Sequence, residues 1–310
     1  MVSGLDAAQK KRLRDGAGAR SVTFGDEIAG GAREAAVGAS DIVFGNVPLA
    51  WLRGSTALRW VQLDSAGVNA YVGLNLGRDR PIVVTNLHDF YGRAVAECAL
   101  AGMLAFYRRL PRLLVAQSRS EWIKPKVEPE IGQLHGATVI ILGAGAIGRC
   151  LARLLAPFEG RVRMFARTSD VAELHTLAQL DEALTSADVV VNALPEVNET
   201  IGILNAERLA RMRSSALVVN VGRGSAIDEP ALLAALDGGR LGGAVLDVTT
   251  VEPLPEKHPF WSHPRVILTQ HTGGRFPAER EGKIDRFLVN LARFDRCEPL
   301  VGTVDLERGY

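Results

Sequence analysis

Six short apolar runs alternate with helical segments between residues 136 and 272. Each run is four or five residues long and nearly continuously apolar, as is typical of parallel strands buried on both faces. Between the runs, apolar residues recur at helical spacing, as at Ile147, Leu151 and Phe158. The pattern predicts a doubly wound parallel sheet with helices on both faces. The predicted strands are Thr138–Leu142, Arg161–Phe165, Val189–Ala193, Leu217–Val221, Ala244–Val248 and Val266–Thr269.

A second, smaller α/β unit is predicted from the N-terminal part of the chain. An amphipathic helix starts near Gly92, carries its apolar stripe as far as Leu113, and is followed by a loop over 122–133. A last helix, over about 280–293, returns the chain to this first unit. The pattern therefore predicts two domains, residues 1–96 plus 281–310 and residues 97–280. The predicted strands of the smaller domain are Val22–Phe24, Asp41–Phe44, Trp60–Leu63 and Ile82–Thr85.

Composition excludes several function classes. The 310 residues contain 36 Lys+Arg and 35 Asp+Glu, and a net charge of +1 gives no overall basic surface for nucleic acid or an anionic membrane. The N-terminus has no apolar signal region, and no apolar run is long enough to span a bilayer, so we expect a cytoplasmic protein without membrane association. Cys98, Cys150 and Cys297 lie far apart without metal-ligand spacing, which predicts free thiols and no metal site.

A glycine-rich loop directly follows the first strand of the larger sheet. In Gly143-Ala-Gly145-Ala-Ile-Gly148, the first glycine permits a tight turn, the second lets a pyrophosphate approach, and the third lets the helix pack on the strand. Ala146 and Ile147 then offer helix N-terminal N–H groups to the phosphates. The motif predicts a Rossmann-type dinucleotide site, with an unliganded glycine-rich turn as the alternative.

The end of the second strand bears on the choice of cofactor. NAD sites carry Asp or Glu about 20 residues after the glycine loop, to bind the ribose hydroxyls. Here Arg167 can pair with a 2′-phosphate, and the hydroxyls of Thr168 and Ser169 can donate to it. We therefore predict that NADP(H) is favoured over NAD(H). The alternative is that Arg167 is a solvated surface residue and that Asp170 binds the ribose.

Three further segments begin at the carboxyl ends of predicted strands, where open α/β sheets bind their ligands. They bring an arginine, a carboxylate and a histidine to the crevice that holds the glycine loop. Taken singly, they are consistent with a surface arginine, a helix-start carboxylate and a buried structural histidine; together they favour a reaction site. The segments are Asn220-Val-Gly-Arg223-Gly224, Leu246-Asp247-Val-Thr-Thr-Val-Glu252-Pro253 and Thr269-Gln270-His271-Thr-Gly-Gly274.

These motifs, in this order, resemble the D-isomer-specific 2-hydroxyacid dehydrogenase family over nearly the whole chain. The resemblance implies a flavodoxin-like α/β substrate domain beside a Rossmann-type dinucleotide-binding domain, with a dimerisation arm within residues 92–133 and a homodimeric assembly. It implies hydride transfer between a nicotinamide cofactor and C2 of a small 2-hydroxy or 2-keto acid. Glyoxylate and hydroxypyruvate are the expected substrates, and a bulkier keto acid is equally open. Further matching segments are Val61-Gln-Leu-Asp-Ser65-Ala66-Gly67-Val68, Val95-Ala-Glu97, Leu194-Pro195, Glu199-Thr200 and Glu298 to Tyr310.

The resemblance also implies roles for individual residues. Arg223 grips the substrate carboxylate and C2 oxygen, His271 is the general acid–base, and Glu252 hydrogen-bonds the other imidazole nitrogen. The backbone N–H groups of the substrate-binding loop receive the substrate carboxylate. That loop consists of Ser65, Ala66 and Gly67. The further cofactor contacts implied are Leu194, Pro195, Thr200, Val221, Gly222, Arg223, Asp247, His271 and Gly274.

The chain departs from the family pattern at two positions. Gln270 stands where a proline usually precedes the histidine; it frees a backbone N–H and relaxes φ, so we expect His271 to be held less tightly. Asn69 stands where an acidic residue is common.

Two other functions compete: a dinucleotide-sensing binding protein, as in the C-terminal-binding-protein corepressors, and a formate-dehydrogenase-like enzyme. The latter should carry Gln opposite the histidine, and Glu252 argues against it.

Overall fold

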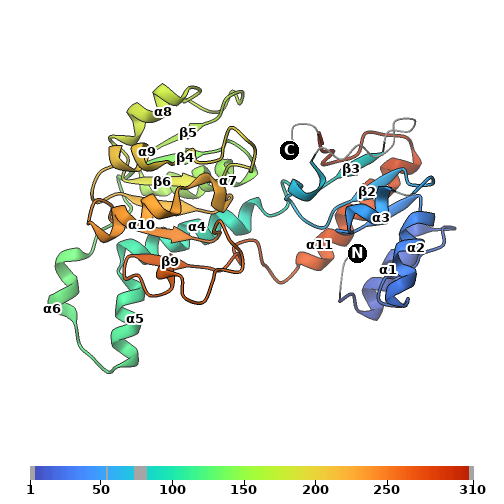
Figure 1. Cartoon of the computed structure of the whole chain (residues 1–310), viewed down its shortest axis with the longest axis horizontal. Helices are drawn as coiled ribbons and strands as arrows, with labels where there is room; N and C mark the ends of the chain where they lie inside the picture. Colours follow the sequence, from blue (N-terminus) through green and yellow to red (C-terminus); the bar gives the residue numbers. More distant parts are fainter. Residues whose placement is uncertain (1–3, 54, 73–81, 307–310) are drawn as a thin grey trace. The chain divides into compact units, whose positions relative to one another are not determined.

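The computed structural model describes residues 4–53, 55–72 and 82–306. The chain divides into two compact units. The small unit comprises residues 1–90 and 276–310, and the large unit comprises residues 91–275. Each unit is an α/β structure built on its own parallel sheet (Figure 1).

The large unit contains a six-stranded parallel sheet of order β5-β4-β6-β7-β8-β9. The chain passes from β4 to its neighbour β5 and then crosses back over β4 to β6, so the strand order reverses there. Open α/β sheets bind ligands at such a reversal, outside the carboxyl ends of the strands. The prediction of six parallel strands is confirmed. They are β4 (Thr138–Leu142), β5 (Arg161–Phe165), β6 (Val189–Asn192), β7 (Leu217–Asn220), β8 (Gly243–Leu246) and β9 (Val266–Leu268).

Helices cover both faces of this sheet, which explains why its strands are continuously apolar. Along β4, Val139 and Ile141 belong to the core beneath α4 and α7, whereas Ile140 and Leu142 belong to the core beneath α8, α9 and α10. Both faces of the strand are therefore buried. The helices are α4 (Gly92–Tyr107), α7 (Ala146–Leu155), α8 (Leu177–Leu184), α9 (Ala206–Arg211) and α10 (Glu229–Asp237).

The described part of the small unit combines helices with a parallel sheet of order β1-β2-β3. Trp60 on β2 is fully buried, stacks on Phe287 and Phe294, and donates its indole N–H to Thr85 Oγ1 at 2.8 Å. This polar contact lets a large aromatic side chain be buried without an unsatisfied donor. The strands are β1 (Ile42–Phe44), β2 (Trp60–Gln62) and β3 (Val83–Thr85), and the helices are α1 (Ala7–Ala17), α2 (Arg33–Ala39), α3 (Leu49–Arg53) and α11 (Glu279–Asp295).

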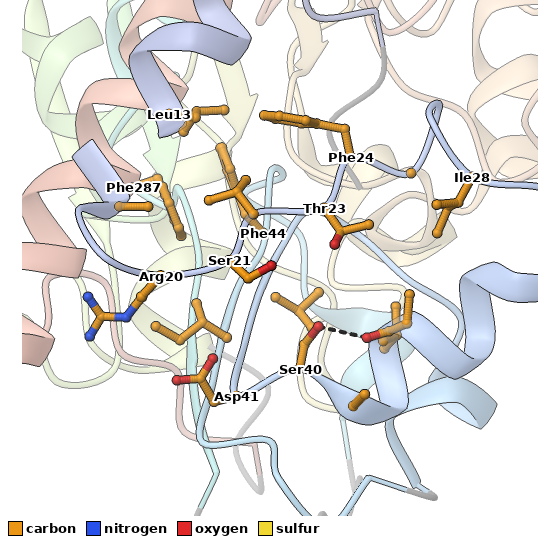
Figure 2. Close-up of a pocket in the computed structure, with 18 of the residues that line it drawn as sticks. Leu13, Arg20, Ser21, Thr23, Phe24, Ile28, Ser40, Asp41, Phe44 and Phe287 are labelled. Carbon is orange, nitrogen blue, oxygen red and sulfur yellow. Dashed lines mark hydrogen bonds between the residues drawn. The ribbon is translucent and has the colours of Figure 1, made fainter. Parts of the chain in front are cut away.

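The predicted strand Val22–Phe24 is wrong, because this segment has no strand assignment and does not pair with β1. A cavity of about 500 Å³ is lined by Ser21–Gly25 on one side and by β1 on the other (Figure 2). Val22 and Phe24 instead pack among side chains of α1 and α11. Their alternating apolar pattern therefore reflects burial against helices and not membership of the sheet.

The predicted long helix from near Gly92 to Leu113 is also corrected. Helix α4 ends at Tyr107, and Arg109 takes a left-handed conformation with φ 54° before the next helix. Pro111 lies in the first turn of that helix, where the missing N–H costs nothing, and it cannot continue α4. The two helices that follow project from the sheet of this unit (Figure 1). They are α5 (Leu110–Ser118) and, within the predicted loop over 122–133, α6 (Lys124–Val127).

None of the helices in the described ranges could span a bilayer, since none combines the necessary length with the necessary apolar character. Nor do three His, Cys, Asp or Glu side chains gather in that part of the chain as a metal site requires. The cytoplasmic location and the lack of a metal stay predictions of the sequence.

Candidate active site

The site residues predicted in the large unit lie at one edge of its sheet. Because all six strands are parallel, the segments that follow them emerge at the same side. The glycine loop follows β4, Arg167 follows β5, Leu194 and Pro195 follow β6, Val221–Arg223 follow β7, Asp247 follows β8, and His271 follows β9.

The glycine loop has one open position and two crowded ones. Gly143 adopts φ 109°, and a Cβ there would lie 2.8 Å from a backbone oxygen of the loop after β6. A Cβ on Gly148 would lie 2.0 Å from Gly143 O. Gly145 precedes α7, and a Cβ there would meet nothing within 4 Å. The open space before the N–H groups of Ala146 and Ile147 fits a dinucleotide pyrophosphate.

Two buried asparagines hold the loop that carries Arg223. The amide of Asn192 donates to Asn220 Oδ1 at 2.8 Å, and the amide of Asn220 donates to Arg223 O at 3.0 Å. Asn220 Oδ1 also accepts the N–H of Gly222 at 3.2 Å. The guanidinium of Arg223 is half-buried and donates to Gly222 O at 2.7 Å. Sequence reasoning assigned no role to either asparagine, although each is a polar residue at the end of an apolar strand.

Glycine at 224 brings this loop against the segment that follows β8. A Cβ on Gly224 would lie 2.0 Å from the carbonyl carbon of Thr249, so no other residue allows this approach. The N–H of Thr249 donates to Glu252 Oε1 at 3.0 Å. The loop of Arg223 and the carboxylate of Glu252 therefore belong to one packed group.

The predicted contact between Glu252 and His271 is present. His271 Nδ1 lies 2.7 Å from Glu252 Oε2, and the two side chains are 54% and 37% exposed. A carboxylate only accepts hydrogen bonds, so Nδ1 carries the proton and Nε2 is the imidazole nitrogen left for another partner. A continuous set of contacts thus runs from the Arg223 loop through Thr249 and Glu252 to His271.

Asp247 anchors the loop that carries the histidine. Its carboxylate is only 5% exposed and accepts the hydroxyl of Thr269 at 2.6 Å and the N–H groups of Thr272 and Gly273, each at 3.1 Å. Its backbone oxygen accepts the N–H of His271 at 2.5 Å. Sequence reasoning assigned Asp247 to the cofactor and did not foresee this second function.

Gln270 and His271 form a left-handed turn, with φ 51° and 55°. Proline, with φ near −65°, cannot adopt this conformation. The freedom in φ expected at Gln270 is therefore what permits this turn. Asp247 nevertheless anchors the loop on both sides of this turn, through its backbone oxygen and its carboxylate.

Cys98, on α4, lies beside this anchored loop. Its thiol is 3.8 Å from Thr269 Oγ1. Burial, with a further contribution from the charge of Asp247, raises the pKa of this thiol. Cys98 is therefore a neutral packing residue at physiological pH.

The segments after β5 and β6 are joined by an ion pair. Arg167 Nη1 lies 3.0 Å from Glu199 Oε1, and each side chain is 57% exposed. A hydrogen bond from its own backbone N–H, and then one from Arg167, lowers the pKa of Glu199. The hydroxyl of Thr200 donates to Pro195 O at 2.7 Å and so closes the loop. Asp170, the alternative ribose ligand, is exposed.

The predicted substrate loop belongs to the small unit and follows β2. Leu87 N–H donates to Ser65 O at 3.0 Å, the Asn86 amide donates to Ala66 O at 2.7 Å, and Ser65 Oγ donates to Gly67 O at 2.8 Å. These contacts use the carbonyl groups of the loop. Within the described ranges, no hydrogen bond from its three N–H groups is found, which leaves them for an anion.

The last two positions singled out in the sequence are Gly274 and Asn69. A Cβ on Gly274 would lie 3.1 Å from Tyr91 Cδ1, so this glycine packs closely against the tyrosine ring. The side chain of Asn69 lies outside the described part of the chain.

Comparison with known proteins gives consistent matches. Residues 100–273 match the family described as D-isomer specific 2-hydroxyacid dehydrogenase, NAD binding domain. The chain is 35% identical over 275 residues to glyoxylate/hydroxypyruvate reductase A of Klebsiella pneumoniae (strain 342), covering 85% of each chain. It resembles a D-isomer specific 2-hydroxyacid dehydrogenase of Xanthobacter autotrophicus Py2 in complex with NADPH and MES, with 29% identity and a TM-score of 0.81 over 100% of this chain and 98% of that one. It also resembles an NADPH-dependent glyoxylate/hydroxypyruvate reductase of Sinorhizobium meliloti in complex with NADP and sulfate, with 25% identity and a TM-score of 0.79 over 97% and 96% of the two chains.

Proposed function

The chain belongs to the D-isomer specific 2-hydroxyacid dehydrogenase family of NAD(P)-dependent oxidoreductases that act on CH–OH groups, and we propose that it reduces glyoxylate and hydroxypyruvate with NADPH as the favoured cofactor. A relative that matches over 85% of its length carries the name of that activity. A matching solved structure is described as NADPH-dependent and holds NADP.

The pairing of His271 with Glu252 is the observation that carries this proposal. With the proton of Nδ1 committed to Glu252 at 2.7 Å, Nε2 of the protonated ring donates to the C2 oxygen of the keto acid and delivers its proton there during reduction. Glu252 stabilises the charged ring before the proton leaves. When bound, the reduced nicotinamide supplies the hydride to C2.

Arg223 binds the substrate in this proposal. A guanidinium donates two parallel hydrogen bonds, so Arg223 takes the carboxylate and the C2 oxygen together. Such orientation of the keto acid is a large part of what a protein contributes to hydride transfer. Within the small unit, the N–H groups of residues 65–67 are a candidate site for a carboxylate.

Residues at the carboxyl edge of the large sheet fit NADPH. The open position at Gly145 and the N-terminus of α7 suit the pyrophosphate, and Arg167 with Thr168 and Ser169 suits the 2′-phosphate. Leu194, Pro195, Val221 and Gly222 follow β6 and β7 at the same edge of the sheet, where the family pattern puts further cofactor contacts.

Steady-state assays with a panel of 2-keto acids against NADPH and NADH test this proposal. We expect the highest kcat/KM with glyoxylate or hydroxypyruvate and NADPH. A clear preference for a bulkier keto acid would overturn the substrate assignment. Tight NADPH binding without turnover of any keto acid would instead support a dinucleotide-sensing binding protein.

We also propose that the chain forms a homodimer through α5 and the segment that follows it. Leu114, Val115 and Trp122 are 63%, 50% and 88% exposed, and such a run of large apolar side chains indicates an interface. By light scattering, we expect the wild-type protein to be a dimer and the Leu114→Glu variant to be a monomer. The variant should not associate because its interface would bury an unpaired charge. Leu177→Glu, at a 49% exposed leucine on α8, is the matched control. A dimer that survives Leu114→Glu would contradict this assembly.

A further inference from the structure

The ion pair between Arg167 and Glu199 crosses the end of β4. In the sheet, β4 lies between β5 and β6, and the two paired residues follow β5 and β6. The contact therefore bridges over the strand whose end carries the glycine loop. In the proposed function, Arg167 is the residue that receives the 2′-phosphate of NADPH.

Glu199 is presented to Arg167 by the fold of its loop. The hydroxyl of Thr200 donates to Pro195 O and accepts the N–H of Val197 at 3.0 Å, which draws residues 195–200 into a compact turn. The backbone N–H of Glu199 and the guanidinium of Arg167 lower the pKa of the carboxylate, so it is ionised at neutral pH. A negative charge is thus held against the group that a phosphate requires.

A phosphate and this carboxylate cannot use the same guanidinium without repulsion. The phosphate has to displace Glu199 from Arg167 or stand beside it, and both arrangements oppose binding. The 2′-hydroxyl of NADH carries no charge and meets no such opposition. The carboxylate therefore weakens NADPH binding selectively.

We propose that Glu199 is a cofactor-specificity residue that limits the preference for NADPH and keeps NADH usable. This inference rests on the proposed function, because it requires Arg167 to bind the 2′-phosphate. It adds a residue from the loop after β6 to the specificity determinants that follow β5.

The test is Glu199→Gln in the full chain, with dissociation constants for NADPH and NADH measured by nicotinamide fluorescence. We expect NADPH to bind about two- to fivefold more tightly, the range of an exposed ion pair, and NADH to be unchanged. The gain should shrink at about 1 M NaCl, where charges are screened over a few ångströms. Calorimetry with adenosine 2′-monophosphate should show the same gain without any activity measurement, and adenosine 5′-monophosphate should show none.

Glu207→Gln is the matched control, because Glu207 is also an exposed carboxylate paired with an arginine, Arg211 on α9. It should leave both dissociation constants unchanged. Equal effects of Glu199→Gln on the two cofactors, no effect on either, or weaker NADPH binding would overturn the inference. Arg167→Ala separates the two claims: if it spares NADPH binding, the phosphate site itself is wrongly assigned. If it weakens NADPH binding while Glu199→Gln has no effect, only the role of Glu199 fails.

Discussion

After β7, β8 and β9, the side chains assigned to the reaction are held by buried groups, whereas after β5 and β6 the side chains assigned to the cofactor phosphate meet in the open. Asn220 fixes the backbone of Arg223, and Asp247, only 5% exposed, fixes the loop of His271. Arg167 and Glu199 are each 57% exposed and share one ion pair. The positions of the side chains therefore depend on packing after β7, β8 and β9, and on charge after β5 and β6. Substitutions in the segments after β7, β8 and β9 should change kcat, and substitutions in those after β5 and β6 should change cofactor affinity.

The largest effect is expected from His271→Ala. Removing the proton donor should lower kcat for keto acid reduction by about 10²- to 10⁴-fold, the usual contribution of a general acid. The dissociation constant of NADPH should change little, because the glycine loop and Arg167, which are assigned to its phosphates, are unchanged. Steady-state kinetics and fluorescence titration measure the two quantities. His135→Ala is the control, since this exposed histidine also faces a glutamate, Glu159, at 4.0 Å; near-normal turnover by His271→Ala would remove it as the acid–base group.

A smaller effect is expected from Asp247→Ala. The substitution leaves the hydroxyl of Thr269 and the N–H groups of Thr272 and Gly273 without their acceptor, so His271 loses its fixed position. A displacement of about 1 Å costs up to about 10²-fold in rate. We expect kcat to fall by about ten- to a hundredfold, with a smaller change in the KM of the keto acid. Asp237→Ala, at an exposed aspartate paired with His263, is the control. Equal losses in stability and activity for both variants would contradict a positioning role.

Arg167→Ala tests the exposed segments after β5 and β6. Charge-assisted hydrogen bonds contribute enough that we expect NADPH to bind about ten- to a hundredfold more weakly. NADH binding and kcat with saturating cofactor should be spared. Arg211→Ala, at an arginine with the same kind of glutamate partner, should change neither cofactor. A parallel loss of NADH binding would show that Arg167 supports binding of both cofactors and is not specific for the 2′-phosphate.

Most of the large unit could be predicted from the sequence because its strands are buried on both faces. Runs such as Val189–Val191 are recognisable without any tertiary information, since each residue meets a helix on one face or the other. In the small unit, Val22–Phe24 has an alternating apolar pattern that is also typical of a strand, yet it packs on helices. The local pattern of apolar residues predicts that a segment is buried, but it does not predict whether a helix or a strand packs against it.

The candidate site was predictable to the level of residue types and strand ends. Arg223, Glu252 and His271 could be named because polar residues follow apolar strands. Asn192 could not, because its function depends on the neighbouring strand supplying Asn220. The pairing of Arg167 with Glu199 likewise depends on strand order, which no local pattern specifies.

The left-handed turn at Gln270 and His271 has a consequence for redesign of this enzyme. Consensus engineering would install the proline that is usual at position 270, on the reasoning that a stiffer residue stabilises a loop. With φ at 51°, that replacement is sterically forbidden and would force the histidine into another backbone path. Residues that tolerate this conformation, glycine or asparagine, are the compatible choices. We therefore expect Gln270→Pro to displace His271 and to lower activity.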